Sequence, residues 1–275
     1  MRITCVGLST VDMVYRVPHI PGPDEKAQAT AVSVAAGGPA LNAAVTAAAL
    51  GADVTLVTAV GAHPLGDLIR SDLDGYAVRL VDAAPHHTAP PPVSAVTVEE
   101  GTGRRTIVSR NAADAGVGVP AGLDLTGVVL VDGHHPALAA AAATGGGRVI
   151  ADAGHWRPVF ATVLPHAWVV AASAGFRLPS GAPLSTAAPL VAVTDGERPV
   201  RWWSPDAEGT IEVPPVAAAD TSGAGDAFHG ALAVALAAGG AFPDALREAV
   251  RVAAIRVEHP GPRAWLADPR LRRPG

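Results

Sequence analysis

Short apolar runs alternate with helix-like segments along most of the chain, a pattern that predicts buried strands joined by helices. Near-continuous apolar runs are expected for strands of a parallel sheet, because helices cover both of its faces. Such strands are predicted at residues 3–8, 53–60, 128–131, 148–151, 168–171 and 190–194. Helices are predicted from Gly37-Gly38-Pro39 through Leu50, from residues 136 and 157, and over 224–238 and 243–258.

An exposed strand and a hairpin are predicted besides these elements. In the exposed strand, residues 27–35, Val32 and Val34 lie among small residues. In the hairpin, residues 93–99 and 105–109 flank the turn EGTGR. We expect this hairpin to pair with the earlier strand. The prediction is an α/β fold: one αβα sandwich domain over residues 1–275 with a mostly parallel central sheet, and a small β-sheet lid from two insertions at about 13–36 and 88–112.

Composition narrows the class of protein. The chain has 275 residues, 49% of them hydrophobic, which is enough for a sizeable core. Its net charge of −5 makes nucleic acid and anionic membranes poor partners, so a small molecule is expected. Cys5 is the sole cysteine, which excludes an internal disulfide and a zinc site of several thiolates. The amino terminus has no signal-like apolar region and no run reaches roughly 18 apolar residues, so a cytoplasmic protein is expected.

Residues 220–230, DTSGAGDAFHG, combine a glycine-rich turn, a helix start and a carboxylate. Backbone amides at a helix start attract anions, so the amides of Gly223, Ala224, Gly225 and Asp226 are candidates for an anion hole. A carboxylate beside phosphate is unfavourable unless it has a task, and accepting a proton from an attacking hydroxyl is the obvious one. The alternative is ordinary helix-start chemistry, since Asp is favourable there by about 0.3–1 kcal/mol.

DTSGAGD, together with AAGGPALNAAVTAAALGA at residues 35–52, resembles the two signatures of the ribokinase-like (PfkB) carbohydrate kinases. The resemblance covers essentially the whole chain, and three stretches are most similar to ketohexokinases and sulfofructose kinases. It implies an ATP-dependent sugar kinase in which Asp226 is the general base. It also implies that Asp12, Gly37, Gly38 and Asn42 contact sugar hydroxyls.

Further substrate contacts are suggested by three polar residues. Lys26, the sole lysine, falls in the first lid segment, where its charge suits a substrate sulfonate or phosphate; a solvated lysine is an equal alternative. Asp132 and His134 follow a predicted strand, where a polar pocket is expected.

The nucleotide side of the site is expected from the resemblance as well. Thr194 and Gly196 resemble the element that packs around ATP, Gly223 and Gly225 are expected to bind its phosphates, and Arg105 resembles a lid arginine over the transferring phosphate. An exposed arginine at a hairpin end is the alternative.

Two departures from the family pattern concern the nucleotide and its metal. Pro199 stands where many relatives have glycine, and the metal-associated NxxE motif is missing. The protein ligands of Mg²⁺ are therefore unknown, and Mg²⁺ is expected to arrive with ATP. The resemblance further implies a monovalent-cation site, for example for K⁺, near Asp220 and Thr221, which can alternatively serve as a helix cap.

The function expected from these residues is phosphorylation by ATP of a primary hydroxyl on a small ketose-like carbohydrate. A nucleoside kinase of the same family remains open, as does a catalytically silent sugar or nucleotide sensor. Relatives suggest a homodimer formed through the lid, with which the exposed strand near Val32 is compatible.

Overall fold

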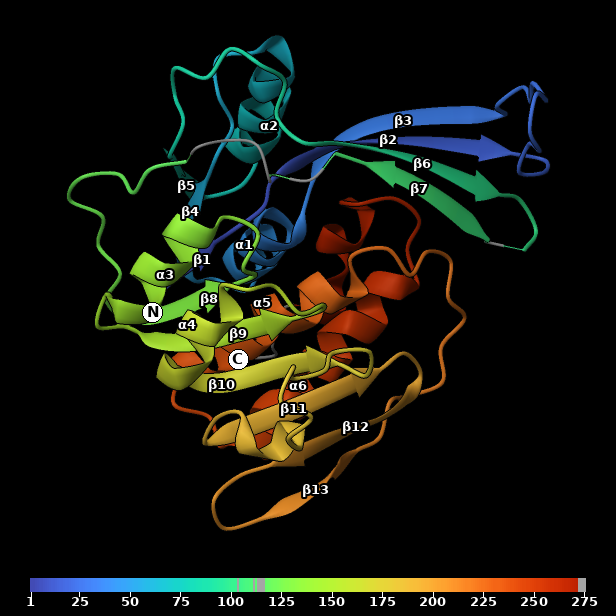
Figure 1. Ribbon diagram of the computed structural model, residues 1–275. Helices are drawn as coiled ribbons and strands as arrows, with labels where there is room; N and C mark the ends of the chain where they lie inside the picture. Colours follow the sequence, from blue (N-terminus) through green and yellow to red (C-terminus); the bar gives the residue numbers. More distant parts are fainter. Residues whose placement is uncertain (103, 111, 113–116, 272–275) are drawn as a thin grey trace.

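A mostly parallel sheet forms the centre of the computed structural model, which describes residues 1–102, 104–110, 112 and 117–271 (Figure 1). Its strand order is β13-β12-β11-β10-β9-β8-β1-β4-β5. The seven strands β11, β10, β9, β8, β1, β4 and β5 are parallel, and β12 and β13 add antiparallel strands at one edge. The strands are β1 (Arg2–Val6), β4 (Asp53–Thr58), β5 (Val78–Asp82), β8 (Val128–Val131), β9 (Arg148–Ala153), β10 (Ala167–Ser173), β11 (Leu190–Asp195), β12 (Arg198–Trp203) and β13 (Glu208–Ile211).

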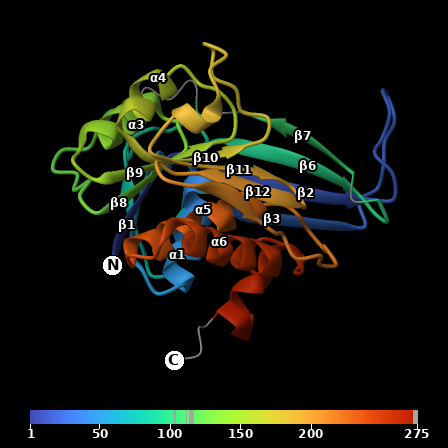
Figure 2. The same ribbon diagram turned by 90° about the horizontal axis from the view of Figure 1, so that it is seen from below.

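Helices cover both faces of this sheet, which explains why its strands are apolar on both sides (Figure 2). One face packs on α1 (Pro39–Ala49), α5 (Ala224–Ala237) and α6 (Phe242–Val257), and the other on α3 (Pro136–Thr144) and α4 (Phe160–Val163). The helix α2 (Pro64–Asp74) lies beside β5 and the base of the lid. Short 3-10 turns occupy Leu164–His166, Leu184–Thr186, Ala264–Ala267 and Pro269–Leu271. No helix within the described ranges has both the length and the apolar character that a membrane crossing requires.

A second, four-stranded sheet projects from the main body as a lid, in the order β3-β2-β6-β7 (Figure 1). Its strands are β2 (Thr10–Val17), β3 (Ala31–Gly37), β6 (Val93–Glu99) and β7 (Arg105–Ser109). Because side chains alternate along a strand, Asp12, Ser94 and Ser109 share the face toward the body, whereas Met13 and Val34 share the opposite face.

The predicted α/β sandwich with a β-sheet lid is confirmed, and strands β6, β7 and β8 begin and end where the sequence predicts them. Three details are corrected. Residues 10–17 form a lid strand that is not among the predicted strands, so Asp12, which lies before the predicted lid insertion, belongs to the lid. The hairpin pairs with this strand β2 rather than with residues 27–35. The helix expected from residue 157 is a single turn, Phe160–Val163. The hairpin turn includes residue 103, which lies outside the described residues.

Candidate functional site

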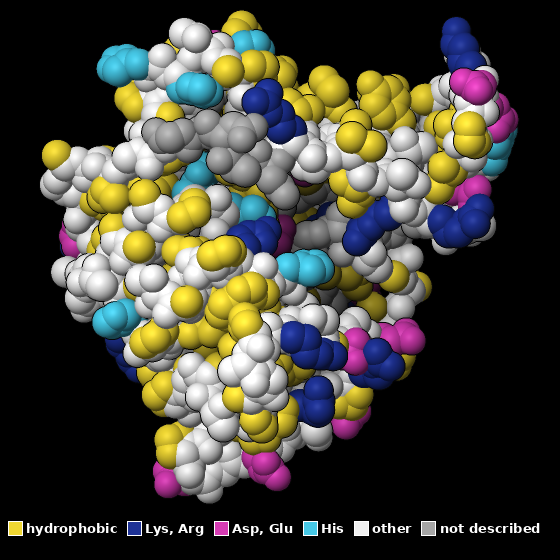
Figure 3. Space-filling view, in the orientation of Figure 1, with side chains coloured by type: hydrophobic (Ala, Val, Ile, Leu, Met, Phe, Trp, Pro, Cys, Tyr) yellow, Lys and Arg dark blue, Asp and Glu magenta, His cyan; other side chains and the backbone are white. Residues whose placement is uncertain are grey.

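A cleft of about 1110 Å³ lies between the inner face of the lid and the main body (Figure 3). Polar side chains from the lid, from α1, from the start of α5 and from the chain after α6 meet in it. Leu8, just after the carboxyl end of β1, lines the cleft, which places it at the edge where open α/β sheets bind ligands. The residues used below that line it are Thr10, Asp12, Gly38, Asn42, Ser94, Arg105, Ser109, Asp220, Thr221, Ser222, Gly223, Asp226, Arg256 and Arg263.

The loop before α5 carries the amides predicted to form an anion hole. Gly223 caps this helix with φ of 71°, a left-handed conformation that a residue with a side chain adopts only under strain. The amides of Gly225 and Asp226 follow in the first turn, where backbone N–H groups have no partner inside the helix, whereas the Ala224 amide makes a long hydrogen bond of 3.4 Å to the Thr221 carbonyl. Gly223 and Asp226 line the cleft, so the positive end of α5 is directed at the same space as this carboxylate.

The carboxylate of Asp226 is held by the neighbouring helix α1. Gly230 lets the two helices approach closely, because a Cβ atom there would lie 2.6 Å from the carbonyl oxygen of Ala43. Asn42 precedes Ala43 in α1, and Asp226 lies one turn before Gly230 in α5; there Nδ2 of Asn42 donates to Oδ2 of Asp226 at 2.8 Å. The close helix contact therefore brings the asparagine and the carboxylate together.

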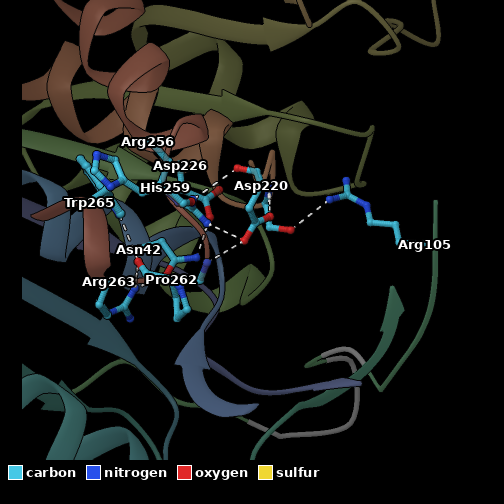
Figure 4. A network of polar contacts seen from close by, with 11 residues as sticks. Asn42, Arg105, Asp220, Asp226, Arg256, His259, Pro262, Arg263 and Trp265 are labelled. Carbon is cyan, nitrogen blue, oxygen red and sulfur yellow. Dashed lines mark hydrogen bonds and ion pairs between the residues drawn. The ribbon is translucent and has the colours of Figure 1, made fainter. Parts of the chain in front are cut away.

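Arg263 completes this chain of polar contacts from the far end of the sequence (Figure 4). Its Nη1 donates to Oδ1 of Asn42 at 3.0 Å, while Nη2 donates to the carbonyl of Ala36 and to Asp72, each at 3.0 Å. Because Oδ1 of Asn42 accepts from an arginine, its amide nitrogen must point to Asp226. Arg263 thereby fixes the orientation of the side chain that holds the carboxylate.

Burial raises the pKa of Asp226, and the charges of Asp132 and Asp12 add to that rise, while the Asn42 hydrogen bond and His229 lower it. The pKa of Asp226 is raised overall. A carboxylate with a raised pKa is a stronger base, provided that it stays ionised at the working pH. The site therefore favours proton acceptance by Asp226.

Asp12 faces Asp226 across the cleft from the lid strand β2. Burial raises its pKa, against the lowering effect of hydrogen bonds from Thr10 and Ser94 and of the Arg263 charge. Thr10 Oγ1 donates to Oδ1 at 2.8 Å, whereas a Cβ atom at Gly37 would overlap Oδ2. Glycine at position 37 thus leaves room for the carboxylate.

Gly38 shapes the floor of the same region. Its φ is 96°, and a Cβ atom there would lie 2.5 Å from the carbonyl oxygen of Leu8. Both the conformation and the contact require glycine, and α1 begins directly after it. The Gly37-Gly38 pair therefore positions the lid strand, the floor of the cleft and the start of α1.

Arg105 reaches from the lid to the loop before α5. Its Nη1 donates to Oγ of Ser222 at 3.2 Å, next to Gly223 (Figure 4). A guanidinium is thereby held on the lid side of the predicted anion hole, where negative charge of a phosphate would be neutralised.

Asp220, at the start of this loop, is bound by a buried arginine. Arg256 Nη2 lies 3.4 Å from Oδ2 of Asp220, and its Nη1 donates to the carbonyl of the same residue at 3.3 Å. The next residue, Thr221, lines the cleft and accepts at its carbonyl from Ala224 at 3.4 Å.

Four residues predicted to contact substrate do not line the cleft, and one of them, Gly37, makes room for the Asp12 carboxylate. Lys26 is exposed in the loop between β2 and β3. Asp132 is buried, and its oxygens accept from the amides of Leu8 at 2.8 Å and His134 at 2.9 Å, so it joins the ends of β1 and β8. The ring of His134 contacts Arg157 instead. Asp132 and His134 do follow a strand at the expected edge of the sheet, but their side chains point into the protein, and that of Lys26 points to solvent.

The predicted ATP residues Thr194 and Gly196 lie at the carboxyl end of β11, outside the lining of the cleft. Gly196 has φ of 61° in the turn to β12, and Oγ1 of Thr194 lies 3.4 Å from the carbonyl of Ala172. The neighbouring strand β10 contacts α5, where His229 Nε2 lies 3.3 Å from the carbonyl of Ala171.

A second carboxylate, Asp152, lies beneath Asp226. Burial raises the pKa of Asp152 to about 6, with His229 lowering it and Asp226 raising it further. Oδ2 of Asp152 lies 3.5 Å from Nδ1 of His229. Because the folded protein holds this proton more tightly than the unfolded chain does, stability is lost as the pH rises from the ordinary pKa of 3.8 to about 6, and the loss is complete above that value.

Asp152→Asn should therefore stabilise the protein in a pH-dependent way. The free energy of unfolding is expected to rise by roughly 2–3 kcal/mol at about pH 7.5, and by much less at about pH 4, where Asp152 keeps its proton in the folded state. Urea unfolding at both pH values measures the difference. Equal changes at the two pH values would contradict the raised pKa.

Arg256 and Arg263 are site residues that the sequence reading missed. A signal for Arg256 was available, since it follows Ala245, Ala249 and Val252 on the buried stripe of α6. An arginine on such a stripe needs partners. Arg263 follows the turn Pro260-Gly261-Pro262, and nothing local indicates its contacts with α1 and the lid.

No group of three or more His, Cys, Asp or Glu side chains within the described ranges has a metal-binding arrangement.

The amino-acid sequence matches the pattern of the pfkB family carbohydrate kinases over residues 1–118 and 181–268. It is 28% identical to a ribokinase of Bacillus subtilis over 273 residues, 94% of this chain and 93% of that protein. A putative ribokinase from Agrobacterium tumefaciens has a similar structure, with a TM-score of 0.82, 26% identity and coverage of 96% and 94% of the two chains. Phosphofructokinase-2 from Escherichia coli, solved in complex with potassium, shares the fold with a TM-score of 0.74, 20% identity and coverage of 95% and 94%.

Proposed function

We propose, since the chain belongs to the pfkB family of carbohydrate kinases, that this ATP-dependent kinase phosphorylates a primary hydroxyl of a small ketose-like sugar, with Asp226 as the general base. The observation that carries the proposal is the meeting of three groups in one cleft. These are the Asp226 carboxylate, the first-turn amides that follow Gly223, and the Asp12 carboxylate on the opposite wall.

In the proposed reaction, the sugar lies between Asp12 and Asp226. Asp12 accepts hydrogen bonds from two adjacent hydroxyls, which orients the ring and rejects analogues lacking them. The attacking hydroxyl transfers its proton to Asp226 as its oxygen bonds to the γ-phosphorus of ATP. The bond from that phosphorus to the bridging oxygen breaks, ADP leaves, and the amides of residues 223–226 stabilise the charge on the transferring phosphoryl group.

Lid strands lie over the cleft in a position suited to excluding water. A kinase must keep water from its phosphoryl group or it hydrolyses ATP. Magnesium would enter with the nucleotide, held by the phosphates and water. The nucleotide base and ribose would extend toward Thr194 and Gly196.

A substrate panel tests the proposal. Purified protein is incubated with ATP and Mg²⁺ and, in turn, with fructose, sulfofructose, ribose and adenosine, and ADP release is measured. ADP formed fastest with a ketose supports the proposal. A preference for adenosine would instead support a nucleoside kinase, which a cleft of about 1110 Å³ has room to serve. Ligand binding without ADP from any acceptor would support a sensor and overturn the proposal.

Arg105→Ala is expected to lower kcat by roughly tenfold to a hundredfold, because a charge-assisted hydrogen bond to the phosphoryl group is worth about 1.5–3 kcal/mol. The KM for the sugar should change little, since the guanidinium lies beside Ser222 rather than Asp12. Steady-state kinetics separate the two constants. Arg104→Ala is the matched control, because the neighbouring guanidinium is bound to Glu99; an equal loss in both variants would argue against contact with phosphate.

We also propose that two copies associate through the lid. Its outer face exposes Tyr15, Val32, Val34 and Val108, and Figure 3 shows hydrophobic side chains gathered over the lid. Such a patch favours an interface. Light scattering is expected to give twice the mass of the chain, and Val34→Asp to shift it to the mass of one copy. A single-copy mass for the unaltered protein would refute the proposal.

A further inference from the structure

Arg256 is a buried cation whose partners belong to the loop before α5. Its side chain is only 4% exposed, near the end of α6. A charged group in such a position must be paired and hydrogen-bonded, because burial removes its water. The contacts that it makes therefore indicate what the charge does.

The partners of this guanidinium are oxygens of the kind that bind a monovalent cation. Nη1 donates to the carbonyls of Asp220 at 3.3 Å and His259 at 3.0 Å, and Nη2 lies 3.4 Å from Oδ2 of Asp220 (Figure 4). Carbonyl and carboxylate oxygens are ligands that replace the water around K⁺ or another hard cation. Here they are already bound to an arginine.

The carboxylate oxygens of Asp220 accept further hydrogen bonds from backbone amides. Oδ1 accepts from the amide of Ser222 at 2.9 Å, and Oδ2 accepts from the amide of Gly261 at 3.2 Å. Burial by itself raises the pKa of Asp220, but the Ser222 hydrogen bonds and the Arg256 charge outweigh it, and the pKa ends below its ordinary value. The carboxylate is therefore ionised and neutralised from within the protein.

The charge of Arg256 lies close to the proposed chemistry. A Cβ atom at Gly223 would lie 3.7 Å both from Nε of Arg256 and from Oδ2 of Asp226. The guanidinium is thus beside the loop that carries the anion-hole amides. Through Asp220 it also holds the start of that loop in place.

We propose that Arg256 takes the place of the monovalent cation that the family resemblance implies near Asp220 and Thr221, so that the kinase works without K⁺. The Asp220 oxygens that a K⁺ ion would need are bound by the guanidinium and by backbone amides, and a second cation beside the guanidinium would be repelled. Arg256 is a positioning residue, because it acts through Asp220 and the loop rather than on the reacting atoms. The proposal rests on the proposed kinase function.

The first test uses the unaltered protein. Its kinase rate is measured at constant ionic strength in K⁺, Na⁺ or tetramethylammonium chloride, together with its thermal midpoint in the same salts. We expect the rate and the midpoint to be the same in the three salts. A several-fold stimulation by K⁺, or a midpoint raised by K⁺ alone, would overturn the proposal.

The second test removes the guanidinium. Arg256→Ala is expected to lower kcat at least about tenfold in tetramethylammonium, and K⁺ should restore both the rate and the thermal midpoint because the vacated oxygens can bind it. Arg247→Ala, on the same helix but paired with Asp244 at the surface, should show neither effect. If Arg256→Ala folds but K⁺ changes neither its rate nor its thermal midpoint, the proposal that Arg256 replaces a monovalent cation is refuted.

The two tests separate this inference from the proposed function. If no acceptor yields ADP, the function fails, and the thermal midpoints of the unaltered and Arg256→Ala proteins still decide the cation question. If Arg256→Ala does not fold, the salt comparison on the unaltered protein decides it: indifference to K⁺ supports the proposal, and dependence on K⁺ overturns it.

Discussion

Asp226→Asn is expected to lower kcat by roughly 10²–10⁴-fold, the usual contribution of a general base. An amide of the same shape cannot take the proton of the attacking hydroxyl. The surroundings should otherwise survive, because Asn42 Nδ2 can donate to an amide oxygen as it does to Oδ2 of the carboxylate. The KM for ATP is therefore expected to stay close to that of the unaltered protein. The thermal midpoint at neutral pH should not fall, because the raised pKa of Asp226 means that its ionised form costs the folded protein stability.

Steady-state kinetics and nucleotide binding by calorimetry check this expectation. Asp244→Asn is the matched control, because Asp244 also lies in the first turn of a helix but is exposed at the surface. It should leave kcat unchanged. Turnover preserved in Asp226→Asn would remove Asp226 from the mechanism, whereas loss of nucleotide binding in that variant would indicate damage to the loop.

Asp12→Ala is expected to raise the KM for the sugar by at least about a hundredfold. Each hydrogen bond to a charged group contributes about 1.5–3 kcal/mol, and the proposal assigns two of them to this carboxylate. ATP binding should be unaffected, since the side chain lies on the lid wall of the cleft, opposite the start of α5.

Sugar titrations at saturating ATP measure the effect. Asp24→Gly removes the same charge from an exposed lid loop, and glycine accepts the backbone φ of 61° found there. This control should keep the original KM. Equal KM values for Asp12→Ala and the unaltered protein would exclude Asp12 as the sugar-binding carboxylate.

Local patterns predicted the fold well because each is decided within a short stretch of chain. A run such as VVLV at β8 indicates a strand that is buried on both faces of a sheet, and Gly38-Pro39 indicates the start of a helix. Strand β2 was missed because it follows β1 after a three-residue gap, so one apolar segment serves two sheets. Which strand pairs with β6 depends on contacts between segments far apart in sequence.

The motif in the loop before α5 predicts the local features of the site but not its long-range contacts. Its order of glycines and carboxylate predicts a glycine-rich turn, a helix start and an acid beside it, all of which the structure contains. The motif could not indicate that Asn42 would bind Asp226, because that contact depends on how closely α1 and α5 pack at Gly230.

The sequence by itself determined the α/β class, the lid, the family and the identity of the candidate base, since these follow from periodicity and from motifs within one segment. The tertiary structure decided which polar residues share the cleft. Lys26, Asp132 and His134 were plausible from their positions along the chain, yet they point elsewhere, while Arg256 and Arg263 arrive from the carboxyl-terminal segment. Side-chain direction and long-range packing have no local signature, and they decide what a site can hold.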